Sequence, residues 1–303
     1  MNHTARSVLP LLAAVSLFAT AGCATHKASD RPRTAYAQPQ SHFARFGTNK
    51  VHYLTAGRGN HVLVFVHCWA GNAGFWSGQL PALAAKARLV LVDLPGHGQS
   101  DKPDTAYTMD FFASAVLAVM NVAHVRKATL IGHSMGAPVI CRVYAQAPER
   151  VAALVSVDGL LHRPPMTQEQ ADQFKAPFSA PGYRAHTTNF INAMFPVPGT
   201  EATRDRVLKE ILETPQYVMA GSMDGMFNLN YSDWDLKHVD VPVIAINTDN
   251  PMWTDAGKDY IRSLSARSDY RTIEGTGHWL MLEKPDEFNT TLTEELEKFG
   301  LVN

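Results

Sequence analysis

Short apolar runs alternate with amphipathic segments along most of the chain, which is typical of a sheet whose parallel strands are connected by helices. Continuous apolar runs, such as the one over residues 62–66, predict strands that are buried on both faces. We predict strands at residues 62–67, 88–93, 128–132, 152–158, 241–247 and 270–274. We predict helices at residues 78–86, 109–122, 137–146, 255–266 and 285–299, the second with Thr108 as its N-cap. The expected fold class is α/β, with a mostly parallel central sheet flanked by helices.

The alternation stops between residues 160 and 237. This stretch is rich in proline, has helical patches at residues 168–174, 186–194 and 203–212, and lacks the apolar runs of a strand. It is too long for a plain loop in a compact domain. We therefore predict an inserted helical lid at residues 160–237, over the C-terminal edge of a core formed by residues 42–159 and 238–303. The alternative is a long irregular connection.

The N-terminus has the pattern of an export signal. A basic residue precedes a short apolar stretch, and Thr20-Ala21-Gly22-Cys23 follows it. The small residues before Cys23 resemble a bacterial lipoprotein box, although Thr20 stands where that box usually has Leu. We expect a signal peptide at residues 1–22, lipidation of Cys23, and a flexible tether at residues 23–41. The protein would then be a periplasmic or cell-envelope lipoprotein held on a membrane surface by its lipid anchor. The alternatives are plain secretion and a retained anchor.

Composition narrows the classes of partner. The formal net charge is −1, and 46% of the 303 residues are hydrophobic and 18% charged. Because no long basic or acidic run is present, nothing indicates a nucleic-acid partner. Neither H-E-x-x-H nor a paired cysteine motif occurs, so we expect no metal and no cofactor. If Cys23 is lipidated, we expect Cys68 and Cys141 to be free thiols.

The strongest chemical motif is Gly132-His133-Ser134-Met135-Gly136, which follows a predicted strand and precedes a predicted helix. This is the context of the nucleophile elbow, a sharp turn with small flanking residues that projects a serine Oγ above the sheet. A serine is a poor nucleophile unless a base removes its proton. We therefore predict Ser134 as a nucleophile; the alternative is an ordinary strand-turn-helix with a capping serine.

The predicted base is His278, which follows the last predicted strand on the glycine-rich loop at residues 274–279. A histidine that comes after the serine and the acid matches the order Ser, Asp, His along the chain of proteins that have a nucleophile elbow. Its acid partner has two candidates, each at the end of a predicted strand. We prefer Asp249 to Asp158, while Asn250 is a third alignment whose neutral amide cannot supply the charge.

An oxyanion formed at Ser134 needs backbone N–H donors. We expect one from Met135, directly after the serine, and one from Trp69 in the loop after the first predicted strand. The alternative for the second is a loop that only packs Trp69 against the lid.

Together these residues resemble the α/β-hydrolase family over about residues 43–299. Besides the elbow, the string from Val92 to Gly98 with Ser100 resembles the family's loop after its fourth strand, and helical lids occur in the family where residues 160–237 lie here. The family's usual His-Gly pair is His67-Cys68 in this chain, and Cys resists backbone angles that Gly accepts. Family members with an Asp nucleophile are dehalogenases or epoxide hydrolases, and Ser134 argues against both.

The resemblance implies an esterase-like hydrolase that forms an acyl-enzyme on Ser134 and acts on a small to medium apolar ester. Methionine and phenylalanine side chains of the lid would line its pocket: Met166, Phe174, Phe190, Met194, Phe195, Met219, Met223, Met226 and Phe227. Two alternatives remain. One is another chemistry on the same triad, namely carbon–carbon hydrolysis, perhydrolysis, or lactone or amide cleavage. The other is an inactive binding lipoprotein.

Overall fold

The computed structural model of the chain describes residues 38–228 and 234–303, all of which belong to one structural unit, Ala35–Asn303. The predicted signal peptide, the lipidation site Cys23 and most of the predicted tether lie outside the described residues. Within the described ranges no helix is long and apolar enough to cross a membrane.

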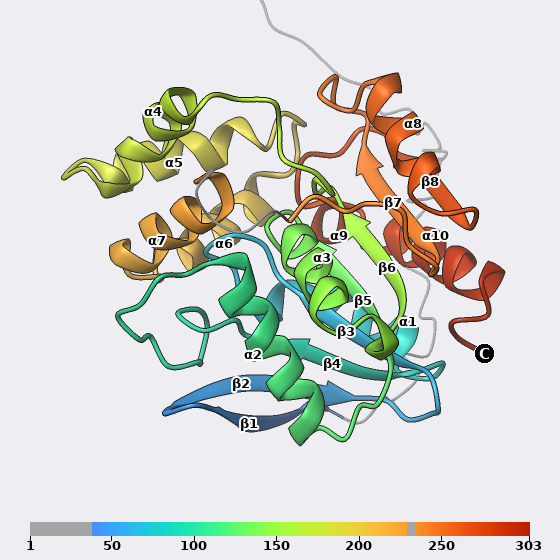
Figure 1. Ribbon diagram of the computed structural model, residues 1–303. Coiled ribbons are helices and arrows are strands. Elements are labelled where there is room, and N and C mark those ends of the chain that lie inside the picture. Colours follow the sequence, from blue (N-terminus) through green and yellow to red (C-terminus); the bar gives the residue numbers. More distant parts are fainter. Residues whose placement is uncertain (1–37, 229–233) are drawn as a thin grey trace, which may run out of the picture. The chain divides into compact units, whose positions relative to one another are not determined.

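An eight-stranded sheet forms the centre of this unit, in the order β1-β2-β4-β3-β5-β6-β7-β8. β1 and β2 are antiparallel to each other, β2 is antiparallel to β4, and all the other neighbours are parallel (Figure 1). The strands are β1 Gln40–Phe46, β2 Asn49–Ala56, β3 Val62–Val66, β4 Arg88–Val92, β5 Ala128–His133, β6 Val151–Val157, β7 Val243–Thr248 and β8 Ser268–Ile273. The predicted mostly parallel α/β sheet is confirmed.

The sequence prediction missed the antiparallel pair β1 and β2, and β1 begins inside the segment predicted as a tether. β1 exposes most of its residues and fully buries only Ala44, so it has no continuous apolar run to reveal it. The six predicted strands are all present, with ends that differ by up to two residues.

Helices cover the two faces of the sheet (Figure 1). Those of the core are α1 Leu80–Leu83, α2 Met109–Val122, α3 Gly136–Gln146, α8 Asp255–Leu264, α9 Leu280–Glu283 and α10 Pro285–Lys298. The expected N-cap is confirmed, because the Thr108 side chain accepts a hydrogen bond from Phe111 N. The predicted helix at residues 78–86 is shorter than expected, since residues Ala73–Gln79 form a 3-10 helix before α1.

Between β6 and β7 the described residues form the helices α4 Gln168–Ser179, α5 Tyr183–Ala193, α6 Glu201–Ile211 and α7 Gln216–Phe227. Figure 1 shows this group beyond the carboxyl ends of the parallel strands. α7 was missed at the sequence level. Its glycines pack against Tyr107: a Cβ on Gly225 would lie 2.0 Å from the Tyr107 carbonyl oxygen, and one on Gly221 would lie 3.0 Å from the ring.

The strand register brings the candidate residues to one edge of the sheet. Val66 pairs with Gly132, His133 pairs with Val157, and Val157 pairs with Ile246. The residues that follow these positions therefore emerge side by side at the carboxyl ends of β3, β5, β6 and β7. Parallel α/β sheets bind ligands at this edge.

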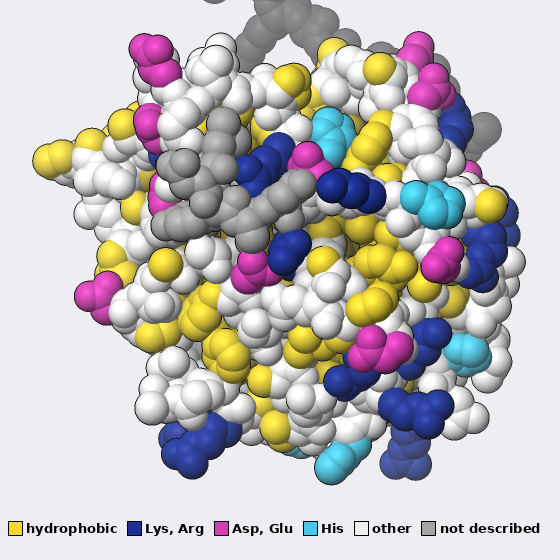
Figure 2. Space-filling view, viewed as in Figure 1, with side chains coloured by type: hydrophobic (Ala, Val, Ile, Leu, Met, Phe, Trp, Pro, Cys, Tyr) yellow, Lys and Arg dark blue, Asp and Glu magenta, His cyan; other side chains and the backbone are white. Residues whose placement is uncertain are grey.

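Acidic and basic side chains are interspersed on the face shown in Figure 2, in keeping with the net charge of −1. Cys68 and Cys141 are buried free thiols, as predicted. Burial raises the pKa of the Cys68 thiol to about 12, so this side chain is not a nucleophile at neutral pH.

Candidate active site

Ser134 occupies a sharp turn between β5 and α3. Its φ angle is +53°, in the left-handed region that costs a non-glycine residue energy, and such strain concentrates at functional sites. The turn is held by hydrogen bonds from Ser134 N to Val157 O at 3.0 Å and from Ala137 N to Ser134 O at 2.9 Å. The flanking glycines are required for space, because a Cβ on Gly132 would lie 2.3 Å from the Gly136 carbonyl oxygen. The local geometry is thus that of the predicted elbow.

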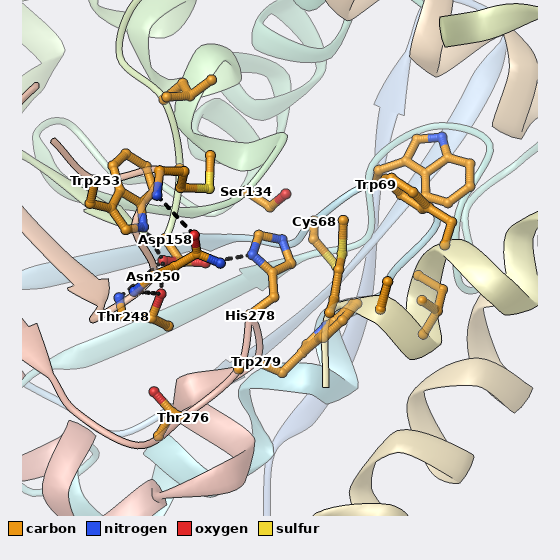
Figure 3. A pocket seen from close by; sticks show the side chains of 18 of the residues that line it. Cys68, Trp69, Ser134, Asp158, Thr248, Asn250, Trp253, Thr276, His278 and Trp279 are labelled. Atoms are coloured by element: carbon orange, nitrogen blue, oxygen red, sulfur yellow. Dashed lines mark hydrogen bonds and ion pairs between the residues drawn. The ribbon is translucent and has the colours of Figure 1, made fainter. Parts of the chain in front are cut away.

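His278 is paired with Asp158. Its Nδ1 donates to Asp158 Oδ2 at 2.6 Å, and the carboxylate can only accept, so the imidazole carries its Nδ1 proton toward the acid. Asp158 follows β6 directly and has a left-handed φ of +42°. In Figure 3 the imidazole lies beside Asp158, and Ser134 faces the same pocket.

The carboxylate of Asp158 is buried and fully engaged. Its Oδ1 accepts from Thr248 N at 3.1 Å, Thr248 Oγ1 at 3.2 Å and Trp253 Nε1 at 2.8 Å. Burial raises the pKa of Asp158, but the hydrogen bond and charge of His278 and the Thr248 N–H outweigh it, so the pKa is lowered. Asp158 is therefore ionised at neutral pH and can stabilise an imidazolium. Thr248 and Trp253 belong to no sequence motif, so neither was predicted as part of the site.

The preference for Asp249 as partner of His278 is wrong in this geometry. Asp249 follows the end of β7, its side chain is exposed, and its Oδ2 accepts from Gly275 N at 3.3 Å. The last residue of β7, Thr248, already donates to Asp158, and Asp249 emerges one residue further along the turn. The second candidate, Asp158, holds the imidazole instead.

The loop that carries His278 is bound on three sides. His278 N donates to Met194 O at 3.1 Å, at the C-terminal end of α5, and His278 O accepts from His133 Nε2 at 2.8 Å. Glu283 accepts from the two neighbouring amides, with Gly277 N at 2.8 Å and Trp279 N at 3.2 Å. These contacts fix the backbone that positions the imidazole.

Two of these partners have shifted pKa values. Burial lowers the pKa of His133 to about 3, so its ring is neutral and its Nε2–H remains a donor to the His278 carbonyl. Burial raises the pKa of Glu283, and the hydrogen bonds from Gly277 and Trp279 partly offset this. Neither residue was predicted from the sequence to support the site.

The two predicted oxyanion donors are placed as follows. Within the described residues neither Trp69 N nor Met135 N donates a hydrogen bond. Met135 directly follows Ser134 in the turn, and Trp69 lines the pocket. The Trp69 side chain packs on the inserted helices: its Nε1 donates to Met219 O at 2.8 Å and its ring lies 5.0 Å from that of Phe178. The left-handed residue of this loop is Ala70, with φ +53°, so Cys68 does not occupy the strained position.

A cavity of about 690 Å³ opens over this constellation. Ser134, Asp158 and His278 line it together with mostly apolar side chains. Of the lid residues predicted to line a pocket, those that do so are Phe174, Phe190, Met194, Met223, Met226 and Phe227. Met166, Phe195 and Met219 are not among the lining residues, and Phe195 stacks instead on Trp279 with ring centroids 4.9 Å apart.

Within residues 38–228 and 234–303 no cluster of three or more His, Cys, Asp or Glu side chains could hold a metal ion. The residues of this site provide a hydroxyl, an imidazole hydrogen-bonded to a buried carboxylate, and backbone amides around an apolar cavity. Such groups serve nucleophilic attack on a carbonyl.

The chain belongs to the α/β-hydrolase fold family, whose model matches residues 61–285. Over 272 residues it is 29% identical to the non-heme chloroperoxidase of Streptomyces lividans, covering 81% of this chain and 95% of that protein. Over 285 residues it is 27% identical to the 2-hydroxy-6-oxo-6-(2'-aminophenyl)hexa-2,4-dienoic acid hydrolase of Metapseudomonas resinovorans, covering 88% of this chain and 93% of that protein.

A shorter stretch of 98 residues is 43% identical to the dihydrolipoyllysine-residue acetyltransferase component of the acetoin cleaving system of Pseudomonas putida. It spans 32% of this chain and 26% of that protein. Among solved structures, a thermophilic esterase from Thermogutta terrifontis superimposes with a TM-score of 0.75 at 20% identity, covering 87% of this chain and 99% of that one. This likeness concerns the fold.

Proposed function

We propose that the protein is a serine hydrolase that cleaves small to medium apolar esters through an acyl-enzyme on Ser134. One observation carries the proposal: the imidazole of His278, held by the buried carboxylate of Asp158, shares an apolar cavity with the strained Ser134. The names of the relatives span several chemistries, so the family by itself supports a hydrolase and not a particular bond.

The proton positions favour this mechanism. Because His278 Nδ1–H is donated to Asp158, the Nε2 lone pair is left to accept the Ser134 proton as Oγ attacks the ester carbonyl carbon. The carbonyl oxygen becomes an oxyanion, which the N–H groups of Trp69 and Met135 stabilise. The intermediate then collapses, the carbon–oxygen bond to the alcohol breaks, and the imidazolium gives its proton to the leaving alkoxide.

Deacylation repeats these steps with water as the nucleophile. His278 Nε2 accepts a proton from water while the hydroxide attacks the acyl carbon, and the proton then passes to Ser134 Oγ as the acid departs. The apolar lining of the cavity excludes bulk water and accommodates hydrocarbon groups of the ester.

An active-site label and a substrate series test the proposal together. A fluorophosphonate probe should label the wild-type protein and should not label Ser134→Ala. The control variant Ser263→Ala lacks an exposed serine of α8 and should be labelled as fully as wild type. p-Nitrophenyl esters of increasing acyl length should be hydrolysed by wild type and by Ser263→Ala. A folded wild-type protein that neither reacts with the probe nor hydrolyses any ester would overturn the proposal.

We also propose that the mature protein is anchored through a lipid on Cys23, because small residues precede this cysteine after an apolar export signal. Mass spectrometry of the mature N-terminus should find an acylated Cys23, and Cys23→Ser should release the protein from membranes. A mature chain that begins beyond Cys23 would refute the anchor and leave the hydrolase proposal intact.

A further inference from the structure

The charges around the cavity are unbalanced. Among the described residues that line it, the titratable acids and bases other than cysteine are Asp158, Asp249 and His278, and none is Lys or Arg. Asp158 is committed to His278. Asp249 is exposed, and among the described residues its carboxylate receives one hydrogen bond, from Gly275 N at 3.3 Å, and forms no ion pair. The described lining therefore carries one carboxylate at its edge without an ion-pair partner, because the nearby ammonium of Lys284 pairs with Glu287 and donates to Glu274 O.

A substrate with a free carboxylate meets two obstacles in such a cavity. The first is desolvation, since a carboxylate that leaves water needs a cation or several hydrogen-bond donors, and the lining is mostly apolar. The second is repulsion by Asp249, whose exposed carboxylate at the cavity edge acts at short range and is screened by salt. An uncharged ester meets neither obstacle.

We propose that the cavity selects uncharged acyl and alcohol groups, and that Asp249 is a specificity-determining residue that repels substrates bearing a free carboxylate. This inference rests on the proposed ester hydrolysis and deepens it. It separates this chain from relatives whose names specify acidic compounds, such as the hexa-2,4-dienoic acid hydrolase and the 2-hydroxy-6-oxononadienedioate hydrolase of Burkholderia vietnamiensis.

Two esters that differ in one charge test the inference. Mono-p-nitrophenyl adipate has a free carboxylate at its far end, and methyl p-nitrophenyl adipate is its uncharged counterpart. The quantity measured is the ratio of their kcat/KM values, charged over neutral, at low ionic strength. We expect wild type to favour the neutral ester by about 100-fold, the effect of roughly 2.7 kcal/mol at 1.36 kcal/mol per factor of ten.

Replacing the charge should change this ratio. Asp249→Asn should raise it by roughly threefold and Asp249→Lys by roughly tenfold, because the second change substitutes attraction for repulsion. Added salt should narrow the difference between wild type and Asp249→Lys, since exposed charges are screened. The matched control Asp259→Lys changes an exposed acid of α8 that does not line the cavity, and it should leave the ratio at the wild-type value.

The outcomes separate this inference from the proposed function. If wild type hydrolyses both esters with similar kcat/KM, or if Asp249→Lys leaves the ratio unchanged while its thermal unfolding shows a folded protein, the inference is overturned and the hydrolase remains. If wild type hydrolyses neither ester, the proposed function fails and the inference with it. A ratio that shifts equally in Asp259→Lys would also refute a specific role for Asp249.

Discussion

The replacement Asp158→Asn gives the sharpest test of the site, because the surroundings of the carboxylate dictate how the amide must lie. Oδ1 faces Thr248 N and Trp253 Nε1, both of which can only donate, and Oδ2 faces His278 Nδ1. With its oxygen toward the Thr248 and Trp253 donors, the asparagine presents its NH₂ group to His278. The imidazole must then accept at Nδ1 and carry its proton on Nε2, where it can no longer take the Ser134 proton.

The opposite orientation of the amide is disfavoured. It would direct the NH₂ group at the N–H donors of Thr248 and Trp253 and leave those donors unpaired beside a buried side chain. An unpaired buried donor costs about 1–3 kcal/mol, which applies fully to Thr248 N and less to the partly buried Trp253 Nε1, so at least about 1–3 kcal/mol separates the two orientations. The histidine is thus held in the wrong tautomer in most molecules. A wrong tautomer of this kind lowers kcat by about 10⁴-fold, equivalent to about 5.5 kcal/mol of activation free energy.

The assay is kcat for p-nitrophenyl butanoate in wild type, Asp158→Asn and Asp249→Asn, with thermal unfolding as the measure of folding. We expect Asp158→Asn to lose about three to four orders of magnitude and Asp249→Asn to retain more than a tenth of wild-type kcat. If Asp249→Asn is the variant that loses orders of magnitude while folded Asp158→Asn retains activity, the assignment of the acid from this geometry is wrong.

Two further predictions concern supports of the site, and a third concerns two buried histidines. Glu283→Gln leaves one of the two amides beside His278 without its acceptor; we expect kcat to fall about tenfold with little change in KM, and Glu283→Asp, which keeps the carboxylate, to recover part of the loss. Trp253→Phe removes one donor from the carboxylate that holds the imidazole, so the acid limb of the kcat/KM profile should move to higher pH. His97 and His133 are buried with pKa values of about 3, lowered mainly by burial, whereas an unfolded histidine titrates near 6.5. The unfolded chain therefore binds more protons between these values, so the free energy of unfolding should fall as pH drops below about 6.5, by up to about 1.4 kcal/mol per pH unit for each histidine. His97→Gln should make this decline shallower in urea unfolding, and an unchanged slope would contradict the account.

The strands that the sequence predicts well are those buried almost continuously along their length. β3 to β7 are buried on both faces and appear as apolar runs, so their existence is evident without tertiary information. β1 is an edge strand whose burial alternates from Ser41 to Phe46, with Ala44 as its only fully buried residue among those described. Its hydrophobicity does not follow this alternation, because His42 lies on the more buried side and Phe43 on the exposed side. Edge strands of this kind are specified by the neighbour that they pair with.

α7 was missed for a related reason. Its interior glycines lower its intrinsic helix propensity, yet Gly221 and Gly225 are what allow it to approach Tyr107 closely. A residue that opposes helix formation locally is thus required by packing between elements. Local propensity and tertiary packing conflict here, and packing prevails.

The choice between Asp158 and Asp249 illustrates what strand ends alone cannot decide. Both acids follow neighbouring parallel strands, so the sheet predicts that both emerge at the same edge. The two acids differ in the φ angle of Asp158 and in the position at which β7 ends before Asp249. Asp158 adopts a left-handed φ directly after β6 and reaches His278, whereas β7 continues two residues past Ile246, the partner of Val157, so that Asp249 lies at the exposed edge of the cavity.

The position of His278 depends on a different kind of information. Ser134 and Asp158 are positioned by the strand register, and the apolar runs of the sequence already imply that register. The imidazole of His278 instead lies on a loop after β8, and the backbone of this loop is hydrogen-bonded to the end of α5, to His133 and to α9. A Cβ on Gly277 would lie 2.3 Å from the Met194 carbonyl oxygen, so the close approach of this loop to the inserted helices requires glycine there. The inserted segment therefore contributes to the placement of the base as well as to the walls of the cavity. Replacing or shortening that segment should consequently impair His278 itself, and a substrate chosen to fit the altered cavity should not restore the lost activity.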